Sequence, residues 1–538
     1  MGEAAHLPQR PTIPVLVAGA GPVGAVLALE LARHGVSNVL IDRSMSASPH
    51  PKMDYLNGRS MELLRRLALA EQIRERGVAP EHPFTFIWSR HFAEPPIAIW
   101  HYASVQELRE RIGSVNDGTM PAEAHQRLQG SLLEELLRER VAAHPLVDFR
   151  PGWTLQAVEQ DRDGVRASLV QSTTGVQDEV WASYLAGCDG AGSVVREQLG
   201  IAVSRLGPPT RHRDVYFRSA DPVLRRHGRA FLTIAAGGLT LVSRDEQDTW
   251  TGSVHLTDEH ARAEDPVELM RRNLGADFRV DEVLSIVAWQ GSLGVSEGYR
   301  SGRVFLAGDS AHQFYPTGGH GANTGIADAV DLGWKLAGCL QGWGGPALLD
   351  SYQSERRPVA LFNREMCANL LEVWLRFPRL VSTGASRQQI AGFLAQETYQ
   401  LDNLGIHFGY RYDDSPVICH EDGEVPAWEW SRIIPTTWPG GRASSVCLAD
   451  GTALFDRLGT GFTLVDLSGT GAGRGVLDAA QLRGVPLRHL PIEDPAVRSV
   501  WERDLVLVRP DQHVAWRGSV PPARWDAVLD RVTGVDGA

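Results

Sequence analysis

Lysine is nearly absent from this chain of 538 residues. Lys52 and Lys335 are the only lysines among 53 basic residues, and all the others are arginine. We ascribe this bias to GC-rich coding and give it no mechanistic weight. An excess of positive charge is missing as well, because 65 acidic residues bring the formal net charge to −12. That balance argues against nucleic acid or an anionic membrane as the main partner.

Cysteine is scarce, and the spacing of the cysteines matches neither a disulfide framework nor a zinc site. The five cysteines are scattered along the chain, and no two stand at C-x-x-C spacing: Cys188, Cys339, Cys367, Cys419 and Cys447. An odd number without paired spacing argues against a disulfide framework and against a zinc site. We therefore expect no bound metal and a reducing, cytoplasmic location.

Long hydrophobic runs are also missing. Every apolar stretch is well short of the ~18 residues that a membrane-spanning helix needs. The first residues, MGEAAHLPQRPTIP, lack the basic stretch and apolar core of a secretory signal. We therefore expect neither a membrane anchor nor secretion.

The remaining composition is that of a globular protein, with 43% hydrophobic and 22% charged residues, and the length suggests roughly two to four domains. Residues 15–35, VLVAGAGPVGAVLALELARHG, predict a strand, a tight glycine turn and a helix. Residues 37–44, SNVLIDRS, predict a second strand. This βαβ unit implies a parallel sheet with a right-handed crossover.

Later segments extend this pattern. Residues 58–77 and 129–144 carry apolar positions at helical spacing, so each predicts one amphipathic helix. Residues 147–171 predict a hairpin, and alternation from about 211 to 256 predicts an antiparallel sheet inserted into the first fold. Residues 302–340 then predict a strand, a glycine-rich loop and a long helix.

The glycine turn has the spacing G-x-G-x-x-G. Gly19 allows the tight turn, Gly21 lets backbone approach a pyrophosphate, and Gly24 lets helix and strand pack closely. The helix N-terminus then faces the phosphates with its partial positive charge. Asp42 ends the second strand, where a carboxylate can accept hydrogen bonds from ribose hydroxyls. These residues, with neighbouring Pro22, Val23 and Arg43, predict a dinucleotide site and leave FAD and NAD both open.

Two further glycine-rich turns follow strands. The first holds Asp189 and Gly190, and the second holds Gly308 and Asp309 followed by PTGGHGAN, residues 316–323. Each could be only a helix-capping turn. The three turns together, in this order and spacing, resemble the class A flavoprotein monooxygenases, the family of para-hydroxybenzoate hydroxylase and phenol hydroxylase. The resemblance covers most of residues 13–360.

The resemblance implies a bound FAD. Asp309 matches the acid that binds the flavin ribitol, and Asp189 with Gly190 matches a turn that supports FAD and NADPH. Gln129 matches a glutamine that contacts FAD, and Lys52 stands where relatives often carry an arginine near the pyrophosphate. The residues implied to surround the flavin ring are Pro316, Gly319, Gly321, Ala322 and Asn323.

The resemblance also implies a reaction. Such enzymes take electrons from NADPH or NADH, form a flavin C4a-hydroperoxide with O2, and hydroxylate a phenolic or polyketide-type aromatic ring. The same scaffold also supports epoxidation, ring opening or Baeyer–Villiger insertion, and a flavin-binding partner protein without turnover is a third alternative.

Candidate catalytic residues come from the phenol hydroxylases. Asp54 matches an aspartate that reaches the substrate pocket, where a carboxylate could accept the phenol proton, and Arg244 matches an arginine of the sheet domain. Ser253 replaces an expected tyrosine, so the known proton relay does not carry over whole. Further candidates for substrate contacts are Tyr216, His255 and His320.

The implied architecture is α/β, with a Rossmann-like FAD-binding domain of the para-hydroxybenzoate hydroxylase type. We expect residues 12–85, 105–190 and 285–403 in that domain, and residues 86–104 and 191–284 in an inserted antiparallel substrate domain. Residues 404–538 would be a linker and a thioredoxin-like domain that lacks C-x-x-C, which argues against redox activity. That last domain would serve packing or contact within a homodimer.

Overall fold

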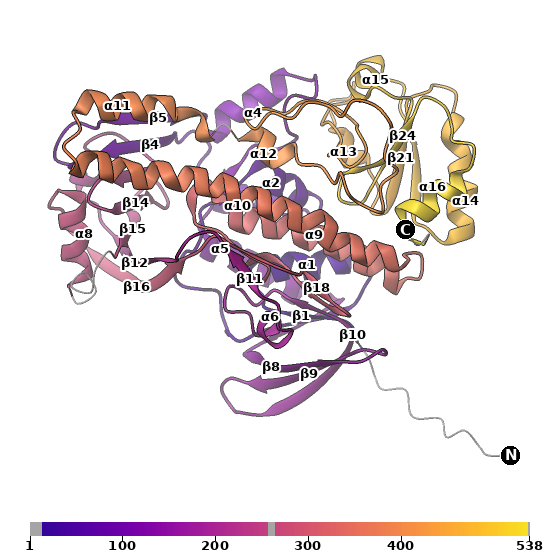
Figure 1. Ribbon diagram of the computed structural model, residues 1–538, viewed down its shortest axis with the longest axis horizontal. Coiled ribbons are helices and arrows are strands. Elements are labelled where there is room, and N and C mark those ends of the chain that lie inside the picture. Colours follow the sequence, from indigo (N-terminus) through magenta and orange to yellow (C-terminus); the bar gives the residue numbers. More distant parts are fainter. Residues whose placement is uncertain (1–12, 257–263, 402, 536–538) are drawn as a thin grey trace.

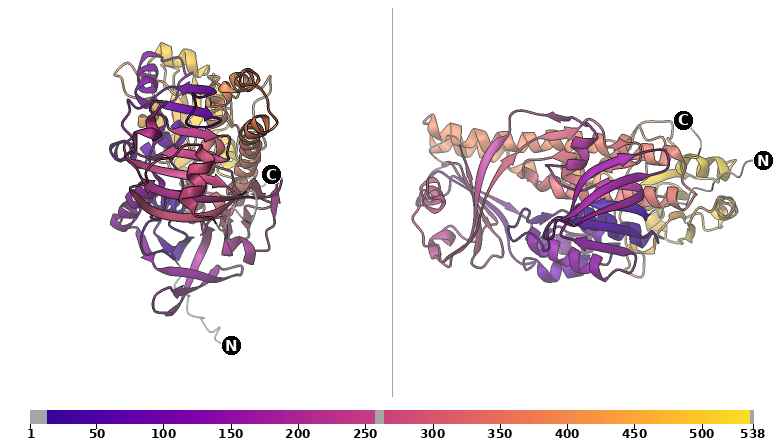
Figure 2. Two further views of the ribbon diagram at one scale, coloured as in Figure 1. Left: turned by 90° about the vertical axis from the view of Figure 1, so that its left-hand side faces the viewer. Right: turned by 90° about the horizontal axis from the view of Figure 1, so that it is seen from below.

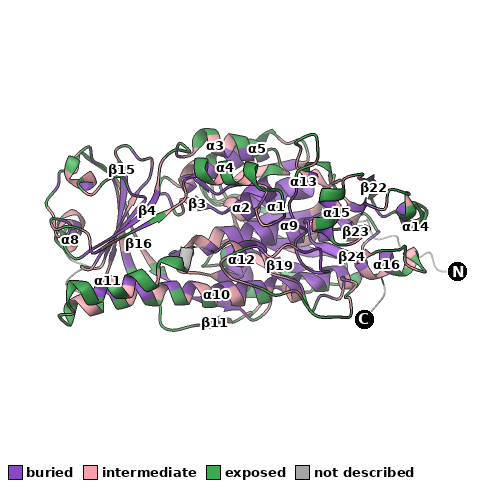
Figure 3. Cartoon of the chain, turned by 90° about the horizontal axis from the view of Figure 1, so that it is seen from above, coloured by how far each residue is buried: buried purple, intermediate pink, exposed green. Residues whose placement is uncertain are grey.

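The computed structural model describes residues 13–256, 264–401 and 403–535. A mainly antiparallel sheet domain lies at one end of an elongated molecule and a small α/β domain at the other, with the nucleotide-binding type of fold between them (Figure 1). Helix α10 (Pro346–Ser382) runs along most of this length. Seen from above, it presents a buried stripe to the protein and an exposed stripe to solvent (Figure 3).

The central domain is built on the predicted βαβ unit. The main path of its sheet has the order β18-β19-β10-β1-β2-β7, and the pairs that link β19, β10, β1, β2 and β7 are parallel. Its strands are β1 (Ile13–Ala18), β2 (Asn38–Asp42), β7 (Val147–Pro151), β10 (Gln177–Gly187), β18 (Arg300–Ser301) and β19 (Val304–Leu306), and the hairpin β8 (Trp153–Gln160) and β9 (Val165–Gln171) extends β10. Continuous apolar runs in β1, β2 and β19 are buried, as expected for a sheet covered on both faces.

Helices cover this sheet and present their N-termini to one region. Helix α1 (Pro22–Arg33) packs against α9 (His320–Leu340), and α5 (Gly130–Ala143) packs against α1. The other helices of this part are α2 (Gly58–Arg65), α3 (Ala70–Arg76), α4 (Val105–Ser114), α6 (Val194–Gln198) and α12 (Leu404–Phe408), whereas α11 (Arg387–Gln396) packs against the inserted sheet. Two short sheets complete it: β3 (Tyr55–Leu56) with β6 (Gln126–Arg127), and β11 (Val203–Arg205), β17 (Gly294–Ser296) and β20 (His312–Gln313).

The inserted sheet has seven strands in the order β16-β12-β15-β14-β13-β4-β5. They are β4 (Phe84–Ser89), β5 (Ala98–Tyr102), β12 (Thr210–Arg218), β13 (Leu232–Ala235), β14 (Leu239–Ser243), β15 (Thr249–His255) and β16 (Glu282–Gly291). Side chains alternate between its faces. One face buries an apolar cluster against α8 (Pro266–Leu274), including Val215, Leu241 and Val254. The opposite face carries the polar residues described below over β12, β14 and β15, and over β4 and β13 it buries a second apolar cluster against α10 and α11.

The last domain has a four-stranded mixed sheet in the order β22-β21-β23-β24. Its strands are β21 (Phe462–Asp466), β22 (Leu487–Pro491), β23 (Leu505–Val508) and β24 (Val514–Gly518), with α13 (Leu454–Arg457), α14 (Val476–Arg483), α15 (Pro495–Trp501) and α16 (Trp525–Val532). Figure 2 shows this domain in yellow from two further sides. The predicted α/β fold class with three parts is confirmed.

One element was predicted wrongly. Residues 58–77 form two helices, α2 and α3, because Ala68 adopts a left-handed φ of 56° that ends the first helix. The predicted hairpin at 147–171 also starts differently, since β7 joins the parallel sheet beside β2. No helix in the described part of the chain combines the length and the apolar character needed to cross a membrane.

Candidate active site

The first glycine turn has the shape that the sequence predicts. Gly19 has φ 106°, and a Cβ atom there would lie 2.3 Å from the carbonyl oxygen of Cys188. A Cβ on Gly24 would lie 1.9 Å from the Gly19 oxygen, so only glycine fits. A Cβ on Gly21, at the N-cap of α1, would meet nothing within 4 Å. Open space therefore faces the positive end of this helix dipole.

Asp42 lies beside this turn at the end of β2. Its carboxylate accepts hydrogen bonds from the backbone N–H of Ala20 and of Ser44, both at 2.7 Å, and forms an ion pair with Arg138 at 3.2 Å. Arg138 lies on α5, and nothing in its helical sequence pattern set it apart. The predicted neighbour Arg43 is exposed. Pro22 begins α1, and Val23 fills the space beside Gly308.

The third glycine segment meets the first. Gly308 (φ 64°) begins a turn in which the Asp309 side chain makes no hydrogen bond to any described residue. Solvent reaches the Asp309 carboxyl, yet surrounding protein still desolvates it enough to raise its pKa. Electrostatic interactions with His312 and Lys52 oppose that rise. Lys52, which is exposed, thus lies within electrostatic range of Asp309, as expected if both face one bound anionic cofactor.

The loop that leads into α9 is fixed to the strand β3. Pro316 precedes a turn in which Gly318 and Gly319 have φ of 77° and 67°. Asn323 accepts a hydrogen bond from the Asn57 N–H at 2.9 Å and donates one to the Tyr55 carbonyl at 3.0 Å. The loop is therefore held before any ligand binds.

The α9 N-terminus has open space beside it. A Cβ on Gly321 would lie 4.0 Å from the Asp309 carboxylate oxygen, and the next residue, Ala322, is half-buried. His320, by contrast, is buried; its ring packs edge-on against His407, and burial lowers its pKa to about 4. The helix therefore begins beside open space while His320 stays neutral.

The second glycine segment is partly a helix cap. Asp189 accepts hydrogen bonds from the Ser193 hydroxyl at 2.5 Å and the Val195 N–H at 3.1 Å, at the start of α6. Gly190 has φ 83° and open space around its missing side chain. This segment lies beside the first turn, because Cys188 donates to the Ala18 carbonyl.

These features fit a flavin dinucleotide. Two helix N-termini, an unpartnered carboxyl and an exposed lysine surround space that glycine leaves open, so the pyrophosphate and ribitol have partners of the right kind. FAD would be held by the first turn, Asp42, Asp309 and the α9 N-terminus.

A second wall comes from the inserted sheet. We call the face opposite α8 the inner face; its central side chains follow from the strand register: His212, Asp214, Tyr216, Thr240, Val242, Thr251, Ser253 and His255. Most of these side chains are only half-buried, whereas those toward α8 are fully buried. Tyr216 donates a hydrogen bond from its hydroxyl to the Gln129 side chain at 3.0 Å. Since Gln129 stands at the start of α5, the inner face points toward the FAD-binding domain.

Asp54 and Arg244 meet at this junction, although 190 positions separate them in the chain. Their side chains form an ion pair, and Arg244 also donates to the Thr251 hydroxyl at 2.9 Å. Beside them, Arg127 pairs with Glu246 at 2.7 Å. Asp54 interacts electrostatically with Arg127 as well. The Asp54 carboxylate therefore lies beside two guanidinium groups.

The remaining substrate candidates lie along the same face. Ser253 faces Asp214 in the β-ladder, and His255 stacks on His212, with ring centroids 5.1 Å apart. His212 also accepts or donates a hydrogen bond at 3.0 Å with the hydroxyl of Tyr315, next to Pro316. Sequence reasoning missed His212, Asp214 and Tyr315, because their proximity depends on strand register.

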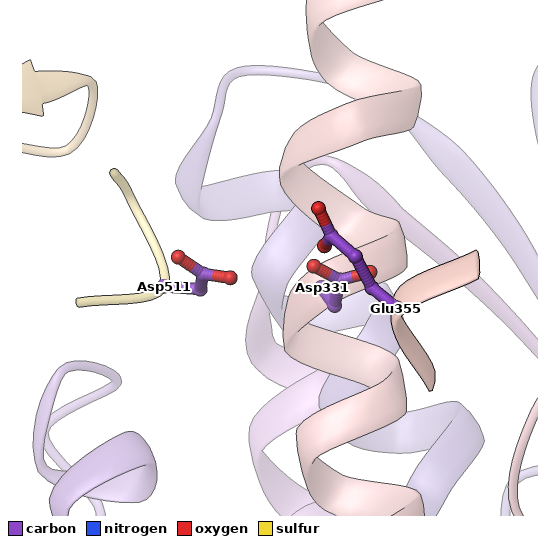
Figure 4. Close-up of side chains that lie close together, drawn as sticks. All are labelled: Asp331, Glu355 and Asp511. Carbon is purple, nitrogen blue, oxygen red and sulfur yellow. The ribbon is translucent and has the colours of Figure 1, made fainter. Parts of the chain in front are cut away.

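Among the described residues, one group could geometrically hold a metal ion: Asp331, Glu355 and Asp511 (Figure 4). Lys335 lies 2.8 Å from Asp331 and 2.6 Å from Glu355, and Arg509 lies 2.7 Å from Glu355. Two buried cations, Lys335 and Arg509, therefore already pair with the carboxylates of the cluster. These contacts make the cluster a structural ion network.

Comparisons with known proteins agree with this geometry. Residues 12–363 match the family model described as FAD binding domain, and residues 436–535 match aromatic-ring hydroxylase, C-terminal. The FAD-dependent monooxygenase apdD of Emericella nidulans is 34% identical over 97% of this chain and 90% of its own length. The tetracenomycin B2 monooxygenase-dioxygenase of Streptomyces olivaceus is 31% identical over 97% of this chain and 98% of its own.

Solved structures match the whole fold. The rebeccamycin biosynthetic enzyme RebC with reduced flavin superimposes with a TM-score of 0.87 at 33% identity, covering 98% of this chain and 99% of RebC. The flavin-dependent monooxygenase PieE, in complex with FAD and substrate, gives a TM-score of 0.87 at 28% identity, covering 97% and 99%. The chain belongs to the FAD-binding aromatic-ring hydroxylase family of FAD-dependent monooxygenases.

Proposed function

We propose that this enzyme uses NADPH or NADH and O2 to hydroxylate a small phenolic or polyketide-type aromatic substrate. The observation that carries the proposal is the junction between the flavin-binding loops and the inner face. There, Gln129 binds Tyr216 and Asp54 binds Arg244. An aromatic ring on the inner face would therefore lie beside the flavin.

FAD, when bound, supplies the redox chemistry that activates O2. The protein has to orient the aromatic ring, exclude water and handle the substrate proton. Arg244, held by Asp54 and Thr251, presents guanidinium N–H groups that can donate a hydrogen bond to an oxygen of the substrate. Lys52 stays exposed, where it can meet the phosphates of a visiting nicotinamide nucleotide.

A direct test combines spectroscopy with turnover. Purified protein should show the visible absorption of bound flavin, and phenolic compounds should stimulate its NAD(P)H oxidation with a product 16 mass units heavier, the mass of one added oxygen atom. Colourless protein that cannot take up FAD would refute the cofactor assignment. Oxidation that no phenol stimulates would refute the substrate class.

A second candidate is another oxygen insertion, such as epoxidation, ring opening or Baeyer–Villiger insertion. It is favoured by the relative named a monooxygenase-dioxygenase, which this chain matches over nearly its full length. Product mass and ring integrity separate the two. A relative from Streptomyces rugosporus named dialkyldecalin synthase is 31% identical over 77% of this chain. Because that name does not describe an oxygenase, NAD(P)H consumption by this protein has to be measured rather than assumed.

We also propose the division into residues 12–85, 105–190 and 285–403 for FAD, 86–104 and 191–284 for substrate, and 404–538 for packing. A homodimer in the cytoplasm belongs to the same proposal. Sedimentation of the FAD-loaded protein tests the oligomeric state.

A further inference from the structure

Asp214 occupies the middle of the inner face. Its Oδ1 atom accepts a hydrogen bond from the Trp289 indole N–H at 2.7 Å, and its Oδ2 atom lies 3.6 Å from Nε2 of His50. Ser253 bonds to it from the neighbouring strand. The Asp214 side chain keeps 15% of its surface exposed, although the protein covers it on most sides.

No arginine or lysine neutralises this carboxylate. In the described chain, the only basic group within 4 Å of Asp214 is His50. The two nearby arginines, Arg244 and Arg127, are already paired with Asp54 and Glu246. The inner face therefore carries one negative charge without a permanent counter-charge.

The groups around Asp214 keep it ionised. Burial alone would raise the pKa of Asp214, but its interactions with His50, Ser253 and Trp289 lower it below its ordinary value. On the same face, burial lowers the pKa of His212 to about 4 and also lowers that of His255. Those two rings stay neutral near pH 7 and do not offset the charge.

We propose that Asp214 determines substrate specificity: it accepts a hydrogen bond from an O–H or N–H group of the aromatic substrate and rejects aromatic carboxylates. The inference rests on the proposed function, in which the substrate lies on the inner face.

Two physical effects separate the two ligand classes. A hydrogen bond to an ionised acceptor is stronger than one between neutral groups, so a donor-bearing ring gains affinity. A carboxylate ligand would meet a second negative charge at a site where protein, rather than water, surrounds both.

The experiment is calorimetric titration of FAD-loaded protein at pH 8. The probes are two matched pairs, 1-naphthol with 1-naphthoate and 2-naphthol with 2-naphthoate. For the wild type, each naphthol should bind at least about tenfold more tightly than its carboxylate partner. In Asp214→Asn this ratio should fall to within about threefold, because the charge is removed from a nearly unchanged shape.

Two variants serve as controls. Asp214→Glu keeps the charge and should keep the preference for naphthols. Glu282→Gln removes one carboxylate from the exposed start of β16 and should keep the wild-type ratio. If Asp214→Asn does not fold, the naphthol-to-naphthoate affinity ratios of the wild type and of Asp214→Glu still test the proposal.

Equal or tighter binding of the naphthoates by the wild type, or no binding by either naphthol, overturns the proposal. An unchanged ratio in folded Asp214→Asn overturns it as well. Calorimetry measures binding without turnover, so a protein that binds naphthols selectively but never consumes NAD(P)H would instead refute the proposed function.

Discussion

Breaking the Asp54–Arg244 pair should cost far more stability than removing both partners. The Arg244 side chain is 5% exposed and the Asp54 side chain 14%, so each single variant leaves a charge buried without its partner. Such a loss costs about 3–5 kcal/mol, whereas apolar residues of similar size in place of both can be nearly neutral. We therefore expect Asp54→Leu and Arg244→Met each to destabilise the protein by about 3 kcal/mol. The double variant should recover most of that loss.

The assay is a double-mutant cycle on FAD-loaded protein, with denaturant midpoints alongside phenol-stimulated NAD(P)H oxidation. The expected coupling energy is roughly 2–4 kcal/mol, while activity should stay low in the double variant because no charge remains to hold the substrate oxygen. The exposed pair Arg76–Glu139, at 2.6 Å, is the matched control and should show no measurable coupling. Additive single effects would refute the buried pair, and an active double variant would refute its role in orienting substrate.

Three further predictions concern the flavin loops. Gly24→Ala should prevent correct folding of the turn, because its Cβ would lie 1.9 Å from the Gly19 oxygen; Gly21→Ala, with open space around its Cβ, should fold but bind FAD more weakly by fluorescence titration. Lys52→Met should slow flavin reduction by NAD(P)H or speed FAD loss in stopped-flow and dialysis measurements, and wild-type values in both would leave the lysine without a role. Burial lowers the pKa of His320 to about 4, so the unfolded chain takes up its proton first as pH falls through about 6.5. Between pH 7.5 and 5.5 the wild type should lose about 1.4 kcal/mol more stability than His320→Gln by denaturant titration, and equal losses would contradict the buried, neutral ring.

Local sequence patterns were sufficient for the nucleotide-binding part of the fold. Gly24 is required by its contact with Gly19 inside one βαβ unit, so the local spacing predicts the turn, whereas the contact that excludes a side chain at Gly19 comes from Cys188, far along the chain. Strands β12 and β15 were predicted from the alternation of apolar and polar residues, which is also a local pattern. Ala68 shows the limit of such reasoning, because nothing in a continuous helical pattern signals a left-handed residue that divides α2 from α3.

The substrate side could not be derived in this way. Asp54 and Arg244 were proposed separately, through resemblance, and only the folded chain shows that each is the other's partner. Asp214 stood in an alternating strand where polar residues normally face solvent. Its position opposite Ser253 and next to His50 depends on three segments far apart in sequence, which no periodicity encodes.

The ion network also gives the third domain a physical connection to the flavin site. Arg509 of the last domain binds Glu355 on α10 and, at 3.0 Å, Asp331 on α9, the helix whose first turn adjoins Asp309. Lys335, one of two lysines in the chain, completes the network at full burial. Buried charges of this kind tolerate little displacement, since each loses its partner when the domains separate. A domain without C-x-x-C can therefore affect cofactor retention by holding α9 in place, without any redox chemistry of its own.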